Sequence, residues 1–251
     1  MSIGVGLGLA EFPFSGATAY WQWVELAETS GVDSIWQTDR LVSREPFLEC
    51  MSVMAALAGA TRRIKFGMNV ASLGLRDPLV LAKQCATIDM LSEGRLLPAV
   101  GVGSPRGAEW KTTNRSDKGA GAVAEEAMEI VVRLWAEESV TFHGKHFHYE
   151  GASIRPKPVQ SPLPFWIGGS SEAAIRRTAK FGTGWQAGQE TPAEVAPVIA
   201  RIKEKVKEQG RSIDHDHYGI GFAYRFGNWD EACVAVRAKA HQARLGRDPK
   251  T

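Results

Sequence analysis

Residues 77–103 read DPLVLAKQCATIDMLSEGRLLPAVGVG and contain a helix followed by a strand. Proline is favoured in the first turn of a helix and glycine just past its end, so Pro78 and Gly94 predict a helix between them. The short apolar run 96–102 that follows predicts a buried strand. A helix that leads into such a strand is the repeating unit of a parallel α/β sheet.

The same alternation continues in both directions along the chain. Strands are predicted at 3–9, 34–37, 64–70, 96–102, 166–168, 184–187 and 218–226, and helices at about 19–30, 49–60, 78–94, 123–134, 195–206 and 230–244. The pattern allows an open doubly wound sheet or a closed (β/α)8 barrel. In both folds the functional groups lie at the carboxyl ends of the strands.

The composition is that of a globular protein, and we expect a single domain over 1–251. Thirty basic and 28 acidic residues leave a formal charge of +2, which argues against nucleic acid or an anionic membrane as partner. The three cysteines are scattered and suit a reducing compartment better than a disulfide framework. Segment 1–12 predicts a first strand and no signal peptide, and no apolar run is long enough to span a bilayer, so we expect a cytoplasmic protein.

Two segments interrupt the alternation. Residues 103–120 are polar, contain glycine and have no periodicity, so they predict a long loop of the kind that often covers a binding site. Residues 139–163 predict an insertion, with a hairpin around Gly144 followed by the proline-rich connection RPKPVQSPLP.

The stretch PFWIGGSSEAAIRR, residues 164–177, joins a strand to a helix through two glycines and two serines. The first N–H groups of a helix have no partner inside it, and the helix dipole adds positive charge there, so a phosphate can bind at such a turn. The alternative is a plain glycine turn with Ser170 or Ser171 as the helix cap. The residues alone leave both interpretations open.

Other motifs give little support for a site. The GVGLGLA stretch at 4–10 has no helix directly after it, and GVGS at 101–104 has Arg106 where a dinucleotide fingerprint needs glycine. His143, His146 and His148 are close enough in sequence to suggest metal ligands, but no HExxH motif accompanies them. We interpret them as a histidine-rich surface hairpin and expect no metal.

Polar residues at the predicted strand ends are candidates for chemistry. Asp39 and Arg40 follow the second strand, where they form either a surface ion pair or a reactive pair. Asn69 lies at the end of the third strand and is either a strand-end cap or an amide that contacts a heterocycle.

Several stretches, in this order along the chain, resemble the bacterial luciferase-like superfamily, which contains flavin-dependent monooxygenases and oxidoreductases that use a deazaflavin, coenzyme F420. They are AETSGVDSIWQTD (27–39), RRIKFGMNV (62–70), the opening stretch 77–103, and 130–186, which includes RPKPVQSPLPFWIGGSS. The resemblance covers most of the chain. It implies a TIM-type (β/α)8 barrel, FMN or F420 as cofactor, and a small organic substrate.

The resemblance also implies roles for individual residues. The turn after the fifth strand receives the cofactor phosphate, and Arg176 or Arg177 adds charge if it faces that turn. The third strand end lies beside the ring system, with a non-proline cis peptide bond. The expected cofactor-binding residues are Asn69, Val70, Ala71, Gly101, Gly103, Gly168, Gly169, Ser170 and Ser171, and the expected catalytic residues are Asp39, Arg40 and Glu109.

The sequence departs from the family pattern in two places. Arg40 stands where the family commonly has histidine, and arginine stays protonated and cannot act as a general base. An anionic substrate group or the charge of a reduced ring is the expected partner instead. The seven predicted strands leave the barrel short of its last βα unit, or leave a gap for a partner chain, as in a homodimer.

Three functions therefore remain open at this point. The first is an oxidoreductase, either an FMN-dependent monooxygenase or an F420-dependent hydride-transfer enzyme. The second is a non-catalytic or degenerate flavin-binding barrel. The third is a barrel that binds a phosphorylated metabolite and no flavin.

Overall fold

The computed structural model describes residues 3–104, 107–188, 190–222, 228 and 230–246. The chain forms two compact units, Met1–Ile220 and Gly221–Thr251. The single domain expected over 1–251 therefore stays a prediction. In the second unit, helix α8 (Ala232–Leu245) ends at Gly246, whose φ of 68° is the left-handed conformation that commonly ends helices.

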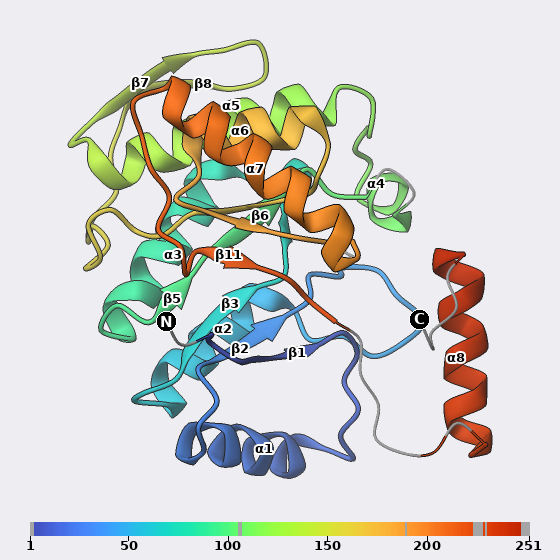
Figure 1. Cartoon of the computed structure of the whole chain (residues 1–251). Coiled ribbons are helices and arrows are strands. Elements are labelled where there is room, and N and C mark those ends of the chain that lie inside the picture. The colour runs from blue at the N-terminus through green and yellow to red at the C-terminus, as the bar shows by residue number, and fades with distance from the viewer. Residues whose placement is uncertain (1–2, 105–106, 189, 223–227, 229, 247–251) are drawn as a thin grey trace. The chain divides into compact units, whose positions relative to one another are not determined.

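In the first unit, short parallel strands follow one another in chain order (Figure 1). One sheet has the order β1-β2-β3-β5 and the other the order β11-β10-β9-β6-β4. The strands are β1 (Gly6–Leu9), β2 (Ser34–Gln37), β3 (Lys65–Met68), β4 (Ala71–Ser72), β5 (Leu96–Leu97), β6 (Ala99–Gly101), β9 (Trp166–Gly168), β10 (Gly184–Gln186) and β11 (Tyr218–Gly219). Strand β3 lies within the third predicted strand and β4 directly follows it, while β5 and β6 divide the fourth. The two sheets therefore form one series of parallel strands in the predicted order.

Helices connect these strands, and local sequence explains where several of them begin. They are α1 (Ala17–Thr29), α2 (Cys50–Ala60), α3 (Pro78–Leu91), α4 (Ala108–Thr112), α5 (Ala120–Ala136), α6 (Glu172–Phe181) and α7 (Pro192–Glu208), with a 3-10 turn at Leu73–Leu75. The carboxylate of Glu49 accepts the N–H groups of Met51 and Ser52 at the start of α2. Asp77 caps α3, and Pro78 occupies its first turn.

Three predicted elements differ from the structure. The fourth strand is divided at Pro98, which has no N–H to donate, and its carbonyl accepts the N–H of Trp166 at 2.8 Å. The predicted loop 103–120 contains helix α4, which at five residues is too short to produce a periodic pattern. Only part of the predicted strand 218–226 is seen as β11, and residues 223–226 lie outside the described residues.

Two tryptophans fill the space between the strands. The rings of Trp36 and Trp166 lie 5.5 Å apart, centroid to centroid. A Cβ at Gly67 would lie 2.6 Å from the Trp36 ring, and one at Gly184 would lie 2.5 Å from the Trp166 ring. Glycine is therefore required at both positions, because a larger residue would displace an indole.

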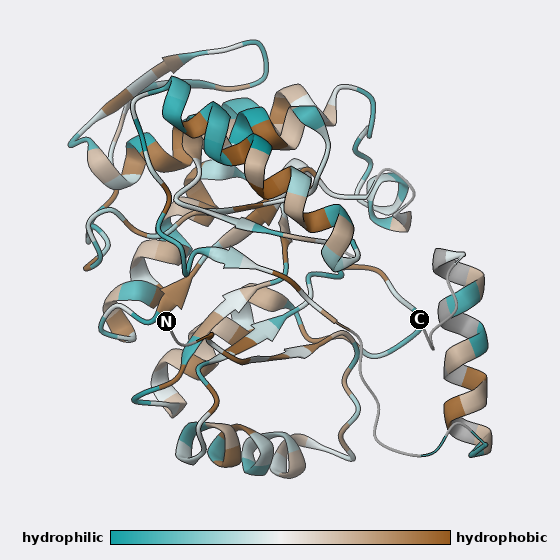
Figure 2. Ribbon diagram, viewed as in Figure 1, coloured by the Kyte–Doolittle hydropathy of each residue, from teal (hydrophilic) through white to brown (hydrophobic). Residues whose placement is uncertain are grey.

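The helices cover the strands with their apolar faces (Figure 2). Helix α5 buries an apolar stripe that includes Met128, Ile130, Val131 and Leu134, and it confirms the helix predicted at 123–134. No helix within the described ranges is both long and apolar enough to cross a membrane.

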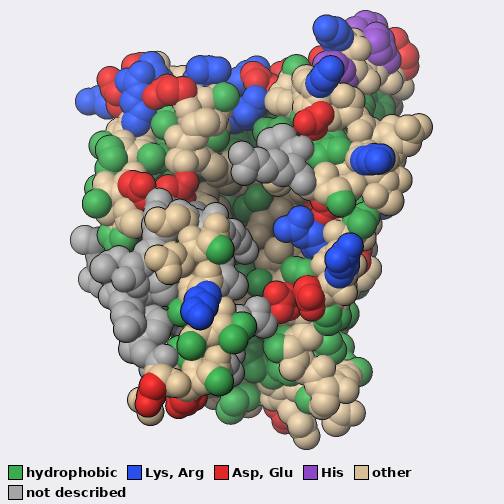
Figure 3. Space-filling model, turned by 90° about the vertical axis from the view of Figure 1, so that its right-hand side faces the viewer, with side chains coloured by type: hydrophobic (Ala, Val, Ile, Leu, Met, Phe, Trp, Pro, Cys, Tyr) green, Lys and Arg blue, Asp and Glu red, His purple; other side chains and the backbone are tan. Residues whose placement is uncertain are grey.

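The insertion after α5 is an antiparallel hairpin of β7 (Val140–His143) and β8 (His148–Ala152), as predicted. Glu126 holds its turn, accepting the backbone N–H groups of Lys145, His146 and Phe147 at 2.9 to 3.2 Å. Burial alone would raise the pKa of Glu126, but these hydrogen bonds hold it below its usual value. The hairpin histidines are exposed and form the purple group in Figure 3.

Candidate functional site

A cavity of about 520 Å³ lies at the carboxyl ends of the strands. Its wall combines the strand ends with residues of α4, α5 and α6, and the hollow is visible in Figure 3. The residues predicted from sequence that line it are Asp39, Arg40, Asn69, Val70, Gly101, Gly103, Glu109, Gly168, Gly169 and Ser171. The structure thus brings together strand ends that are more than 140 residues apart in the chain.

Two of the predicted cofactor-binding residues do not line the cavity. Ala71 is fully buried in the core. The hydroxyl of Ser170 donates a hydrogen bond to Glu190 Oε1, so this side chain is engaged away from the cavity wall.

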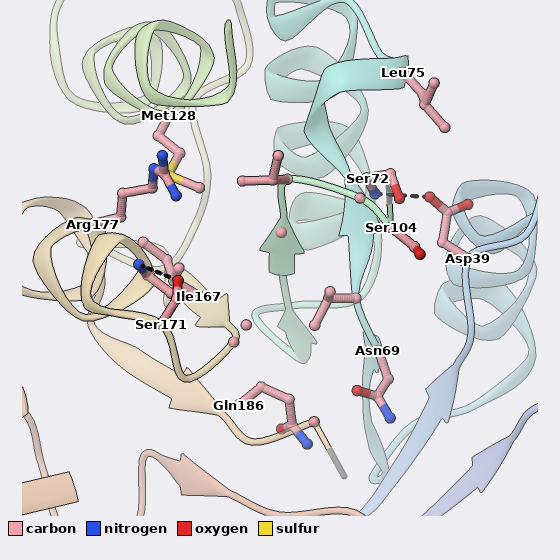
Figure 4. Close-up of a pocket in the computed structure, with 18 of the residues that line it drawn as sticks. Asp39, Asn69, Ser72, Leu75, Ser104, Met128, Ile167, Ser171, Arg177 and Gln186 are labelled. Atoms are coloured by element: carbon pink, nitrogen blue, oxygen red, sulfur yellow. Dashed lines mark hydrogen bonds between the residues drawn. The ribbon is translucent and has the colours of Figure 1, made fainter. Parts of the chain in front are cut away.

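The turn after β9 serves both as a helix cap and as part of the cavity wall. Ser171 Oγ accepts the N–H of Ala174 at 3.2 Å and caps α6, the bond drawn in Figure 4. Gly169 has a φ of 106°, which side chains rarely adopt. Gly168 leaves room for Val70, because a Cβ there would lie 3.1 Å from both Val70 methyl groups. The first turn of α6 therefore opens onto the cavity.

Arg177 supplies a positive charge beside this turn. Its side chain lines the cavity and is 12% exposed, whereas Arg176 is exposed. Its Nη2 donates to the carbonyl of Gly121 at 3.1 Å, and its Nε lies 3.6 Å from Glu125 Oε2. That Nε is buried and has no hydrogen-bond partner among the described residues. A buried N–H without a partner costs free energy unless a ligand satisfies it.

Asp39 lines the cavity, but its carboxylate is occupied. Oδ1 lies 2.6 Å from Arg76 Nη2, and Oδ2 accepts the N–H of Ser72 at 2.9 Å. The Asp39 side chain is only 2% exposed. The sequence placed this acid correctly at the end of the second strand, but nothing in it identified Arg76 as the partner.

Arg76 also fills the centre of a cluster that has the ligand types of a metal site. Asp39, Glu49 and Cys50 bring their ligand atoms within 4.8 Å of one another. Arg76 Nη2 lies 2.6, 3.2 and 3.3 Å from atoms of these three residues, so a cation already occupies the position between them. Burial, and then the charge of Asp39, raise the pKa of the Cys50 thiol, which stays protonated.

Arg40 and Glu109 form a second ion pair on the cavity wall. Arg40 Nη1 lies 3.3 Å from Glu109 Oε1, with side chains 40% and 7% exposed. Helix α4 carries Glu109 to this position. The neighbouring Trp110 is held by a 2.8 Å hydrogen bond from its Nε1 to the carbonyl of Ser104.

Amide groups line another part of the cavity. Asn69 and Gln186 project toward it from the ends of β3 and β10 (Figure 4). The Asn69–Val70 peptide bond is cis, as the family resemblance implied. Met128 of α5 lies beside Arg177 in the same view. Sequence reasoning missed Met128, because an apolar residue in a helical stripe has the same pattern in a core as in a pocket. It missed Trp110, because this residue lies in a segment predicted as a loop without periodicity.

The chain resembles known proteins over most of its length. The model of the luciferase-like monooxygenase family matches residues 10–247. The uncharacterized protein Rv0940c of Mycobacterium tuberculosis and the uncharacterized protein Mb0965c of Mycobacterium bovis are each 32% identical over 168 residues, or 67% of this chain. The match spans 57% of the length of these relatives.

Three solved structures share the fold. Monooxygenase RslO1 from Streptomyces bottropensis has a TM-score of 0.82 at 21% identity, covering 97% of this chain and 78% of its own. The oxygenating constituent of 3,6-diketocamphane monooxygenase from Pseudomonas putida, in complex with FMN, has a TM-score of 0.78 at 18% identity. The match covers 98% of this chain and 77% of that one. The F420-dependent tetrahydromethanopterin reductase from Methanopyrus kandleri has a TM-score of 0.72 at 22% identity. The match covers 88% of this chain and 65% of that one. The chain therefore belongs to the luciferase-like monooxygenase family and has its TIM-barrel type of α/β fold.

Proposed function

We propose that the cavity binds FMN or coenzyme F420 and that the protein is an oxidoreductase acting on a small organic molecule. One observation carries the proposal: the first turn of α6 and the buried Arg177 open onto the same cavity as the amides of Asn69 and Gln186. FMN and F420 both combine a phosphate with a flat polar ring system, and these two kinds of group suit the two parts of the wall.

The residues present fit such a cofactor. The cavity of about 520 Å³ lies within the range of pockets that hold cofactors. The unpartnered Nε of Arg177 and the N–H groups of the first turn of α6 are donors suited to phosphate oxygens. Gly101 and Gly168 keep the wall open around Val70. A Cβ at Gly101 would lie 3.0 Å from a methyl group of Val70, and a Cβ at Gly168 would lie 3.1 Å from both of them.

When bound, the cofactor would supply either oxygen activation or hydride transfer. The protein's own residues would then position it and exclude water. The guanidinium of Arg40 is suited to bind an anionic group, and its pairing with Glu109 ties α4 to the loop after β2. Asp39, which bonds the N–H of Ser72, would hold the wall beside Asn69 rather than exchange protons.

A second candidate is a non-catalytic flavin-binding protein. It is favoured by the fact that both acids proposed for catalysis, Asp39 and Glu109, are held in ion pairs. This candidate predicts cofactor retention without turnover under any combination of reductant and oxygen.

The test is to incubate the purified protein separately with FMN and F420, remove excess ligand, and record the visible spectrum. Retained FMN supports the monooxygenase branch, and retained F420 supports the hydride-transfer branch. Retention of neither contradicts the proposal. Oxygen uptake with reduced FMN, and F420 oxidation or reduction with a panel of small alcohols and ketones, then separate an enzyme from a binding protein.

A further inference from the structure

A carboxylate lies directly behind the wall beside the α6 turn. Ser170, between the cavity residues Gly169 and Ser171, donates its hydroxyl hydrogen bond to Glu190 Oε1. A Cβ at Gly188, another wall residue, would lie 3.3 Å from Glu190 Oε2. This Oε2 is buried and has no hydrogen-bond partner among the described residues.

Glu190 lies at the start of helix α7. It immediately precedes Thr191, the N-cap of α7, and the start of a helix stabilises a carboxylate. The Ser170 hydroxyl supplies a further hydrogen bond to it. No described arginine or lysine is within ion-pair distance of Glu190.

The charge beside the α6 turn is therefore not strongly positive. Arg177 is the basic residue on the cavity wall there, and Glu125 lies 3.6 Å from its Nε. Glu125 and Glu190 together reduce the positive potential that Arg177 and the α6 helix dipole present to an anion on this side of the cavity. Such a site attracts one negative charge, and a second charge is opposed by the nearby carboxylate.

We propose that Glu190 makes the site select a cofactor with a singly charged phosphodiester over one with a doubly charged phosphate monoester, and so F420 over FMN. F420 carries its phosphate as a diester, whereas a phosphate monoester such as that of FMN has a charge near −2 at pH 7. The inference rests on the proposed function, and it assigns Glu190 as a residue that determines cofactor specificity.

The test compares dissociation constants for four ligands: FMN, riboflavin, F420, and the F420 fragment that lacks the phosphate and everything attached to it. Glu190→Gln removes the charge but keeps an oxygen that accepts from Ser170. We expect it to tighten FMN binding about tenfold, to change riboflavin binding less than twofold, and to tighten F420 binding less than FMN binding. Unchanged riboflavin binding also shows that the variant is folded.

Two further variants separate charge from other effects. Glu204→Gln removes an exposed carboxylate from α7, and we expect no change in any of the four constants. Ser170→Ala keeps the charge of Glu190, so it should not raise FMN affinity relative to riboflavin.

The outcomes distinguish this inference from the proposed function. If the wild type binds FMN or F420 and Glu190→Gln leaves the FMN-to-riboflavin ratio unchanged, the role of Glu190 is wrong and the proposed function stands. The role is also wrong if Ser170→Ala tightens FMN as much as Glu190→Gln does. If the wild type binds none of the four ligands, the proposed function itself is wrong, and this inference with it.

Discussion

Arg76 Nη2 lies 2.6 Å from Asp39 Oδ1, and this ion pair fixes the acid that ends β2. The two side chains are 13% and 2% exposed, so little water screens their charges. The second oxygen of Asp39 accepts the N–H of Ser72, which begins the 3-10 turn after β4. The pair therefore joins the ends of two neighbouring strands at the cavity wall.

Removing Arg76 should destabilise the protein strongly. In Arg76→Ala, Asp39 keeps its negative charge in a buried position without its cation, and the free energy of unfolding should fall by about 3 kcal/mol. Urea denaturation measures this loss. Arg201→Ala is a matched control, because Arg201 forms exposed ion pairs with Glu172 of α6 and Glu204 of α7, and its loss should cost far less stability than the loss of Arg76. Equal effects of the two variants would contradict a structural role for the Asp39–Arg76 pair.

Substitution of Gly169 should sharply weaken cofactor binding. Gly169→Val forces a branched side chain into a φ of 106° at the turn beside the cavity. We expect FMN and F420 affinity to fall at least about tenfold, because the N–H groups of the turn would be displaced. Fluorescence titration measures both constants.

Gly210→Ala provides the control for Gly169→Val. Gly210 also has a positive φ, 65°, and a Cβ there would meet nothing within 4 Å. This variant should lose about 1 kcal/mol of stability and keep full cofactor affinity. If Gly169→Val binds cofactor as tightly as Gly210→Ala does, the assignment of the phosphate to the α6 turn is wrong.

Breaking the Arg40–Glu109 pair should loosen α4 without unfolding the protein. Arg40 is 40% exposed, so Glu109→Gln should cost less than about 1 kcal/mol of global stability. Amide hydrogen exchange in 107–113 should become faster, because the ion pair ties this short helix to the loop after β2. Hydrogen–deuterium exchange mass spectrometry measures the change, with the β7–β8 hairpin as the internal reference. Unchanged exchange in 107–113 would show that Trp110 alone holds α4.

The hairpin turn should weaken in acid through Glu126. The folded protein holds the pKa of Glu126 below its usual value of 4.5, so protons bind more readily in the unfolded state. The resulting stabilisation is fully present above pH 4.5 and is lost as the pH falls through the lower folded pKa. At pH 7, Glu126→Gln should be less stable than the wild type, and the difference should shrink toward pH 3. Thermal unfolding at both pH values tests this, and a difference that is constant with pH would contradict it.

Much of the fold was predictable because its signals are local. Glu49 and Pro78 sit at the starts of α2 and α3, and the apolar spacing around Val131 marks α5. Each signal depends on a few neighbouring residues, so it can be read without the tertiary structure. The division of the fourth strand at Pro98 and the short helix α4 were missed, since the first depends on two different strand partners and the second is shorter than a periodic pattern.

The candidate site was predictable only in outline. Strand ends meet at one edge of a parallel sheet, so the positions of Asp39, Asn69 and Gly168 at the ends of their strands were enough to place them together. Which of two adjacent arginines faces the cavity depends on the rotation of α6 against its neighbours, and the structure selects Arg177 over Arg176.

The order of strands and helices, most of their boundaries and the family of the protein follow from the amino-acid sequence alone, because capping, apolar periodicity and strand-end motifs are written in adjacent residues. The ionic partners follow from tertiary packing instead: Arg76 with Asp39, Glu109 with Arg40, and Glu190 behind the α6 turn. Coulomb energy depends on distance and burial, and both are set by how separate segments pack rather than by their spacing along the chain.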